Sequence, residues 1–187
     1  MAGSAYLGQQ GWRHAAESAW LKRALRAPIF SPAQVKLLER AFAAEPMNAE
    51  TAYSLGEAFR IQSLEGGSDY RELANTAMEW FGRCIKLNPY DGYGFLRYGM
   101  CLDWTERSSE SAPYFDHAEQ LDPNGYYTVA NIGLHYVELG NYAAAKPWFE
   151  RATRLEWENN EIARNYLEIS NAKLIEAATN DFRARIR

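Results

Sequence analysis

The stretch of sequence that decides the fold is VANIGLHYVELGNYAAAKPWFERATRL, residues 129–155. Its apolar residues recur at intervals of three and four, the period of an amphipathic helix, on both sides of the Gly140-Asn141 pair. That pair predicts a turn, with Asn141 as the N-cap of the second helix. Gly133 and Ala152 are small where we expect the two helices to approach closely. The stretch therefore predicts a helical hairpin.

The same pattern recurs along the chain at an offset of 34 residues. The matching positions include glycine, aromatic, small and aliphatic residues: Gly99, Phe115, Ala118 and Leu121 in one copy correspond to Gly133, Phe149, Ala152 and Leu155 in the next. Leu87-Asn88-Pro89 and Leu121-Asp122-Pro123 end two copies, and Ala44-Glu45-Pro46 ends an earlier one. Each proline stops one helix before the next begins. No alternating strand pattern competes, so the sequence predicts an all-α fold.

These positions are the signature positions of a known repeat: Val129, Ile132, Gly133, Tyr136, Gly140, Tyr142, Ala145, Phe149, Ala152 and Leu155. The chain resembles the tetratricopeptide repeat family over roughly residues 31–172. The resemblance implies a right-handed α-solenoid of helix-turn-helix repeats. Three positions depart from the family pattern. Trp157 stands where proline is usual, Glu106 stands in place of a turn glycine, and Ser111 occupies a position usually held by alanine.

We expect residues 1–187 to form a single α-solenoid domain. It would contain a degenerate helix pair (12–46), a repeat lengthened by an insertion near 62–69 (49–90), two regular repeats (91–124 and 125–158) and a capping helix (159–187). The first helix of the degenerate pair is expected over Trp12–Leu25. Ser31 followed by Pro32 predicts an N-cap, and Asp69 with Glu72 suggests a capping box.

Composition and charge narrow the function. The chain has 20 basic and 24 acidic residues, a net charge of −4, which argues against nucleic-acid binding. No apolar run is long enough to span a bilayer, and the first residues lack the pattern of a signal peptide. His14, His117 and His135 are spread over different helices and predict surface or boundary residues rather than metal ligands. Asp103 is expected in a solvated acidic turn. We therefore expect no enzyme activity, no metal and no cofactor.

The family resemblance implies that the first helix of each repeat lines a concave groove where ligands bind. Carried over to this sequence, the candidate groove residues are Tyr53, Arg60, Tyr93, Arg97, Met100, Trp104, Tyr127, Asn131, Leu134, Arg164 and Asn165. Tyrosine, tryptophan and arginine dominate binding hot spots, which favours this set. Asn131 and Asn165 lie one repeat apart and suggest two amides that bracket an extended peptide. The residues with which some relatives hold a C-terminal carboxylate do not fit these positions in either register.

The leading hypothesis is a non-catalytic protein–protein interaction module that binds a peptide or partner segment in its groove. Two alternatives remain open at this point. One is a soluble accessory domain of a larger bacterial membrane-associated assembly, such as glycan polymerase, secretion or outer-membrane machinery. The other is a carbohydrate-binding repeat domain. The sequence is compatible with a cytoplasmic or periplasmic location, and it leaves self-association open.

Overall fold

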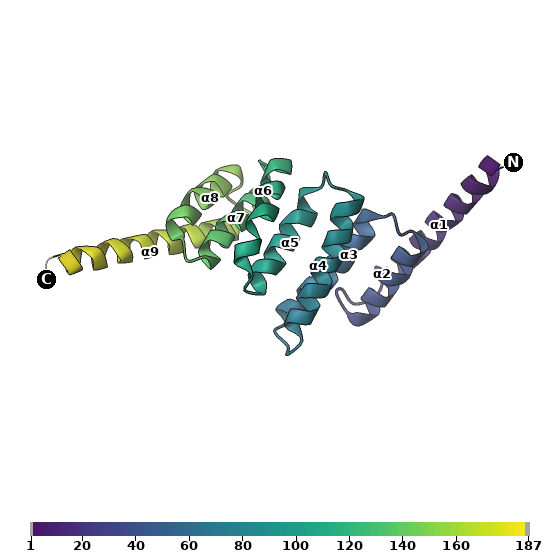
Figure 1. Ribbon diagram of the computed structural model, residues 1–187, viewed down its shortest axis with the longest axis horizontal. Coiled ribbons are helices and arrows are strands. Elements are labelled where there is room, and N and C mark those ends of the chain that lie inside the picture. Colours follow the sequence, from purple (N-terminus) through teal and green to yellow (C-terminus); the bar gives the residue numbers. More distant parts are fainter. Residues whose placement is uncertain (1, 186–187) are drawn as a thin grey trace. The chain divides into compact units, whose positions relative to one another are not determined.

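The computed structural model describes residues 2–185. Over this range the chain is helical and contains no strand. The elements are α1 (Ala2–Ala24), α2 (Pro32–Ala44), α3 (Ala49–Leu64), α4 (Tyr70–Leu87), α5 (Gly92–Trp104), the 3-10 turn η1 (Ser108–Glu110), α6 (Ala112–Leu121), α7 (Tyr126–Glu138), α8 (Tyr142–Leu155) and α9 (Glu161–Arg185). Figure 1 labels the α-helices. The predicted all-α repeat architecture is confirmed.

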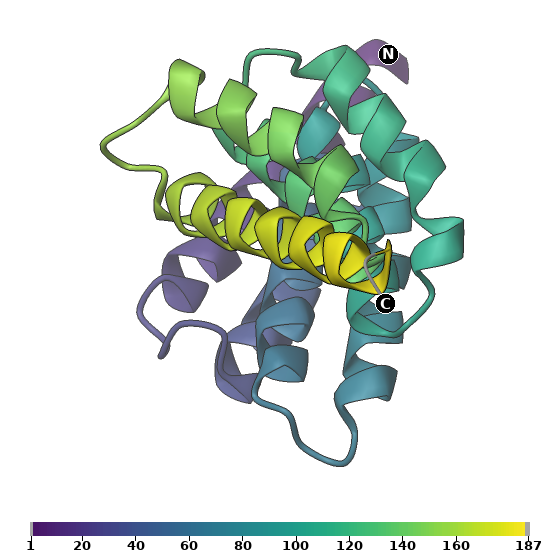
Figure 2. The same ribbon diagram turned by 90° about the vertical axis from the view of Figure 1, so that its left-hand side faces the viewer.

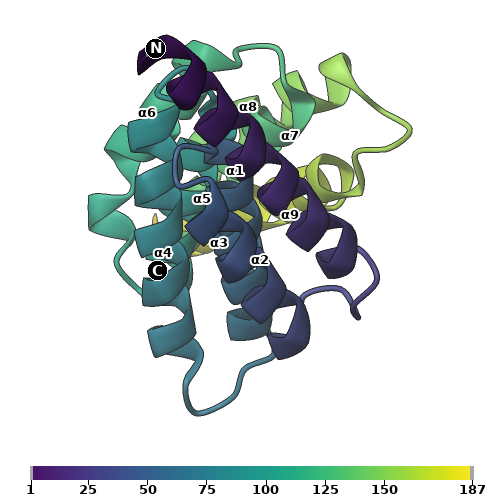
Figure 3. The same ribbon diagram turned by 90° about the vertical axis from the view of Figure 1, so that its right-hand side faces the viewer.

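The helices group into two compact units. The N-terminal unit ends at Cys101 and the C-terminal unit begins at Leu102. In the N-terminal unit α1 packs on α2, and α3 on α4, while α2 also contacts α3. Figure 3 shows α1 beside α2. In the C-terminal unit α7 packs on α8 and α8 on α9, the green and yellow helices of Figure 2.

The core of the N-terminal unit is built from aliphatic side chains of the first three helices and aromatic rings beside them. Leu38, Leu55 and Ala58 are buried, and the rings of Phe42 and Trp80 meet edge to face at 5.0 Å. Burial of such side chains contributes about 1.5–3 kcal/mol each. The core therefore holds the degenerate pair and the first repeat together.

A buried carboxylate adds a polar link between α1 and α3. Glu17 is 5% exposed, and it accepts hydrogen bonds from the Asn48 side chain at 2.7 Å and from the Thr51 hydroxyl at 2.9 Å. Asn48 is also the N-cap of α3, because its oxygen accepts from the backbone of Glu50. Glu17 thus orients the capping residue that starts the next helix.

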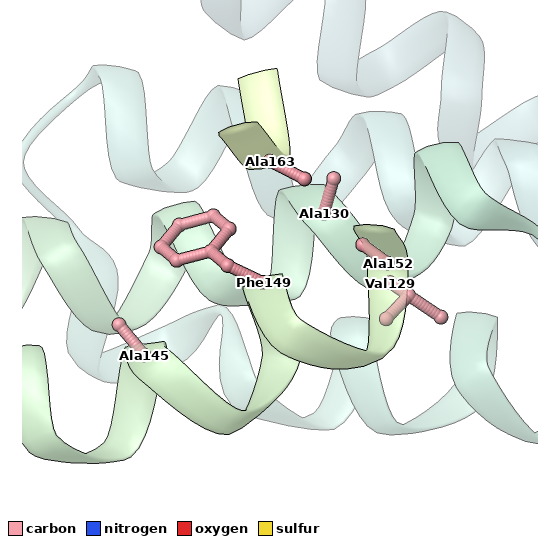
Figure 4. Close-up of a cluster of buried hydrophobic side chains, with 6 residues drawn as sticks. All are labelled: Val129, Ala130, Ala145, Phe149, Ala152 and Ala163. Atoms are coloured by element: carbon pink, nitrogen blue, oxygen red, sulfur yellow. The ribbon is translucent and has the colours of Figure 1, made fainter. Parts of the chain in front are cut away.

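The core of the C-terminal unit is centred on one phenylalanine. The Phe149 ring is fully buried among small side chains, as Figure 4 shows: Val129, Ala130, Ala145, Ala152 and Ala163. A methyl group on Gly133 would lie 2.6 Å from this ring, and one on Gly56 would lie 2.6 Å from Phe81 in the other unit. The predicted reason for glycine at this repeat position, close helix approach, is confirmed.

The helix caps match the sequence prediction in two of three cases. Ser31 accepts from the Gln34 backbone at 3.2 Å, and Asn141 accepts from the Ala144 backbone at 3.0 Å. The capping box predicted for Asp69 and Glu72 is wrong. The Asp69 backbone has φ −98° and ψ 8°, not the extended conformation of a capping residue, and its side chain makes no cap hydrogen bond. Instead its carboxylate lies beside Gly67.

The first helix is longer than predicted. Its apolar periodicity begins near Trp12, but α1 begins at Ala2. Trp12 is 71% exposed, so its side chain does not pack on the core. Apolar periodicity reports burial, and for that reason it did not predict a helix start before Trp12.

The two regular repeats share one turn geometry. Gly140 has a positive φ of 69°, and Glu106, at the equivalent position of the preceding repeat, has a φ of 64°. The same backbone hydrogen bond closes each turn, from Asn141 to Tyr136 and from Arg107 to the Leu102 carbonyl, both at 2.8 Å. The turn thus imposes a left-handed conformation whichever residue occupies it.

Replacing Glu106 by glycine is expected to raise the free energy of unfolding by about 1 kcal/mol, because glycine adopts positive φ without steric cost. The reverse change at the equivalent position, Gly140→Ala, is expected to lower it by a similar amount. Urea unfolding followed by circular dichroism measures both. A Glu106→Gly variant less stable than the parent would contradict the assignment of strain to this turn.

Candidate functional site

The eleven groove candidates fall into both units. The N-terminal unit carries Tyr53, Arg60, Tyr93, Arg97 and Met100 on α3 and α5; the C-terminal unit carries Trp104, Tyr127, Asn131, Leu134, Arg164 and Asn165.

In the N-terminal unit, one carboxylate sits between two guanidinium groups. Glu57 accepts two hydrogen bonds from Arg60, at 2.7 and 3.1 Å, and its Oε1 lies 3.1 Å from Nε of Arg97. The side chains are 15% exposed for Glu57 and 11% for each arginine. Charges this shielded interact more strongly than charges in open solvent. Two positive groups share one negative group in this cluster.

Tyr53 and Met100 complete the cluster. Arg97 donates to the Tyr53 hydroxyl at 3.3 Å and also contacts the Met100 sulfur at 3.3 Å. Burial raises the pKa of Tyr53 despite the neighbouring Arg97. Burial also raises the pKa of the adjacent Cys101 thiol to about 12, so this thiol is protonated at neutral pH. The structure therefore brings four of the sequence candidates together in one contiguous cluster: Tyr53, Arg60, Arg97 and Met100.

An apolar cavity of about 400 Å³ opens beside this cluster. Its walls come from α1, the loop after it, α2 and α3, and they include Leu21, Ala24, Leu25, Ile29, Phe30, Gln34, Leu38, Asn48, Glu50, Thr51, Tyr53, Ser54 and Glu57. Leu25 is 82% exposed and Ile29 73% exposed. Because Tyr53 and Glu57 belong to both features, the cavity and the charged cluster form one continuous surface. We call it the α1–α3 surface.

The loop at the mouth of the cavity is held by three hydrogen bonds. Phe30 has a φ of 58°, and its backbone N–H donates to the Gln34 side chain at 2.6 Å. The Gln62 side chain donates to the Phe30 carbonyl at 2.5 Å, and the Gln34 amide donates to the Ala24 carbonyl at 3.2 Å. Backbone strain of this kind persists only where surrounding contacts hold it.

Sequence reasoning missed the cavity residues. Leu25 and Ile29 lie in a loop outside the repeat register, so the family's groove positions do not include them. A signal was present in the sequence, since two large aliphatic residues flank Pro28, Leu25 at the end of the predicted first helix and Ile29 beyond it.

The candidates in the C-terminal unit range from buried to exposed. Asn131 is 2% exposed, and its amide donates to the Tyr127 carbonyl at 2.8 Å. The interpretation of Asn131 as one of two amides bracketing a peptide is therefore wrong, because the helix itself engages this side chain. Leu134 packs against the Phe149 core, whereas Asn165 is exposed and Tyr127 is half-buried.

Arg164 closes the helix end that lacks the usual proline. Its guanidinium donates to the carbonyls of Trp157 and Glu158, the latter at 2.8 Å, and lies 5.8 Å from the centre of the Trp157 ring. These hydrogen bonds give the backbone carbonyls in the loop between α8 and α9 a donor. Arg164 therefore has a structural role.

Two aromatic candidates are exposed at the surface. Trp104 and Tyr93 are each 41% exposed.

A buried polar network lies at the end of α5, where the sequence suggested a solvated turn. The ring Nδ1 of His135 is 3.1 Å from both oxygens of Asp103, and the Ser111 hydroxyl donates to Asp103 at 2.7 Å. The side chains are 5% exposed for His135 and 9% for Asp103. Both predictions, a solvated Asp103 and a surface or boundary His135, are wrong. Serine at the small position supplies a hydroxyl that an alanine would lack.

This Ser-His-Asp network does not have the geometry of a nucleophilic triad. In a triad the two histidine nitrogens contact the serine and the aspartate separately. Here the same Nδ1 meets Asp103 and lies 3.1 Å from the Ser111 hydroxyl, which is fully buried. The network joins α5, the turn before α6, and α7.

Comparisons with known proteins agree with this architecture. The model of the tetratricopeptide repeat matches residues 127–159. The chain is similar to a solved structure of MamA MSR-1 at 26% identity and a TM-score of 0.52, over 66% of each chain. A second MamA crystal structure is 20% identical, with a TM-score of 0.54, over 66% of this chain and 62% of that one. Thus the chain spans slightly less than two thirds of these MamA chains.

A longer match supports the fold alone. The PilF structure of Pseudomonas aeruginosa has 20% identity and a TM-score of 0.69, over 90% of this chain and 72% of that one. No curated protein sequence matches the chain. Between residues 2 and 185, none of the helices combines the length and apolar character that crossing a membrane requires.

Proposed function

We propose that the α1–α3 surface binds a segment of a partner protein, since residues 127–159 match the tetratricopeptide repeat and this repeat fold serves as a protein-interaction module. Large apolar side chains at the mouth of a concave pocket are typical of such binding sites. The apolar groups supply affinity, and the cluster around Glu57 supplies polar contacts at one side.

The observation that carries this proposal is the exposure of Leu25 and Ile29 at the cavity. When a partner covers these side chains, removing their apolar surface from water stabilises the complex by about 25 cal/mol per Å² of buried area. The cavity also favours a peptide over a sugar, the carbohydrate alternative of the sequence, since the exposed Leu25 and Ile29 side chains offer no hydrogen-bonding group to a sugar hydroxyl. The other alternative, an accessory domain of a larger membrane-associated assembly, is compatible with this proposal, because the same surface would bind a component of that assembly.

Replacing both Leu25 and Ile29 by serine is expected to weaken binding of selected peptides at least tenfold, while leaving the fold intact because both side chains are exposed. Peptides of about ten residues are first selected on the parent protein from a displayed random library. Their affinities are then measured by fluorescence anisotropy. The matched control replaces Ile175 and Phe182, which are 67% and 65% exposed on α9, by serine.

The control variant should bind like the parent protein. If the Leu25/Ile29 variant retained full affinity for every selected peptide, or if the α9 variant lost as much, the cavity would not be the binding site.

A further inference from the structure

We infer that the α1–α3 surface selects a partner segment in which a lysine or arginine lies close to a bulky apolar side chain, with the cation directed at Glu50. This inference rests on the proposed function, because it names the chemistry of the segment that binds there. It follows from the charged and polar groups in the walls of the cavity.

The acidic residues of the cavity lie on the wall that α3 supplies. Glu50 and Glu57 are about two turns apart on this helix, and both line the cavity. Among the described residues that line it, none is a lysine, an arginine or a histidine. A cavity wall that carries carboxylates and no cation attracts a positively charged group of a ligand.

The two carboxylates differ in what they already contact. Glu57 accepts two hydrogen bonds from Arg60 and lies 3.1 Å from Arg97. Glu50 is exposed, and its own hydrogen bonds use its backbone N–H and its carbonyl. Within the part of the chain that the structure describes, no side chain pairs with the Glu50 carboxylate. An incoming cation therefore finds its partner at Glu50.

The neutral polar side chains of the lining already have partners within the protein. Each makes at least one hydrogen bond to another described residue: Gln34, Asn48, Thr51, Tyr53 and Ser54. A charged acceptor forms a stronger hydrogen bond with a cation than these neutral groups do. The Ser54 hydroxyl, one turn from Glu50, donates to the Glu50 carbonyl, so its oxygen can still accept from the same ligand cation.

The end of α1 fixes the orientation of the segment. The last turn of this helix carries Lys22 and Arg23, close in sequence to Leu25 at the cavity. A ligand cation is repelled from this end and attracted to Glu50, so like charges reject the reversed segment. The apolar side chain of the ligand then covers Leu25 and Ile29. Because one cavity contains both features, the cation belongs within about two residues of that side chain in an extended segment.

The test uses the peptides selected from the random library. We expect lysine or arginine within about two residues of a leucine, phenylalanine or tryptophan in most of them. A selected peptide with lysine at this place is synthesised again with acetyl-lysine, which removes the charge and keeps the side chain. The parent protein should bind the lysine peptide about threefold more tightly, as expected for one ion pair at an exposed carboxylate. Raising the salt concentration should reduce this ratio.

Two variants assign the preference to Glu50. Glu50→Gln should bring the ratio of the two affinities close to one and change the affinity for the acetyl-lysine peptide little. Glu50→Lys should reverse the preference, so that a peptide with glutamate in place of the lysine binds most tightly. The matched control, Glu72→Gln, removes the same charge from an exposed side chain in the first turn of α4 and should keep the parent ratio. Thermal unfolding of each variant confirms that it is folded.

The outcomes separate this inference from the proposed function. Equal binding of the lysine and acetyl-lysine peptides by the parent protein, or an unchanged ratio in Glu50→Gln, overturns the inference. An equal loss of the ratio in Glu72→Gln also overturns it, because the preference would then reflect the overall charge of the chain. If those same peptides still depend on Leu25 and Ile29, the proposed function stands. Peptides that depend on neither these two residues nor Glu50 would overturn both.

Discussion

Replacing Phe149 by alanine is expected to lower the free energy of unfolding by about 3–5 kcal/mol. The ring is fully buried, and it is the large side chain around which alanines of α7, α8 and α9 pack. Small neighbours cannot move into the vacated volume, because Gly133 is already in contact with the ring position and the alanines have no flexible atoms. The expected loss therefore lies at the upper end of the range for core truncations.

Urea unfolding, monitored by the far-ultraviolet circular dichroism of the helices, measures this loss. The matched control is Phe182→Ala in α9, whose ring is 65% exposed and whose replacement should change stability by less than about 0.5 kcal/mol. Similar stabilities for the two variants would mean that the Phe149 cluster is not the core of the C-terminal unit.

The second large effect is expected at Asp103. Its replacement by alanine removes the carboxylate that faces the buried His135 ring and the Ser111 hydroxyl, and leaves both without this acceptor. Leaving a buried polar group without its hydrogen-bond partner costs about 1–3 kcal/mol for each group. Because the network joins α5 to α7, the loss should appear as a lower unfolding midpoint of the C-terminal unit.

A double variant tests this explanation. Adding His135→Leu to Asp103→Ala removes the stranded ring nitrogen and should recover part of the stability, since two apolar groups cost less than one unsatisfied polar group. The control is Glu110→Ala in the neighbouring exposed pair with Arg107, which should leave the midpoint nearly unchanged. A large effect at Glu110 and none at Asp103 would be inconsistent with the network as described.

The sequence predicted best those features that repeat. Gly133 and Phe149 occupy positions that the repeat fills with a small and a large residue. The 34-residue periodicity therefore predicted their contact. The same register identified Glu106 as a departure, and the structure gives its physical meaning, a positive φ without glycine.

The features that the sequence did not predict depend on contacts between neighbouring repeats. Asp103 meets His135 across 32 residues, and Arg97 meets Tyr53 across 44. The periodicity of a single helix predicts that its polar residues face solvent. It does not identify a polar partner that a neighbouring helix supplies. The α1–α3 cavity was missed for a related reason, because a loop rather than a helix face supplies its mouth.

The hydrogen bonds that hold Phe30 determine how the α1–α3 surface would bind. The loop is fixed by Gln34 and Gln62 before any partner arrives, so Leu25 and Ile29 are displayed by a preorganised backbone. Association with such a surface loses little loop entropy. Differences in affinity among its ligands would then reside mainly in dissociation rates, with association rates that vary little from one ligand to the next.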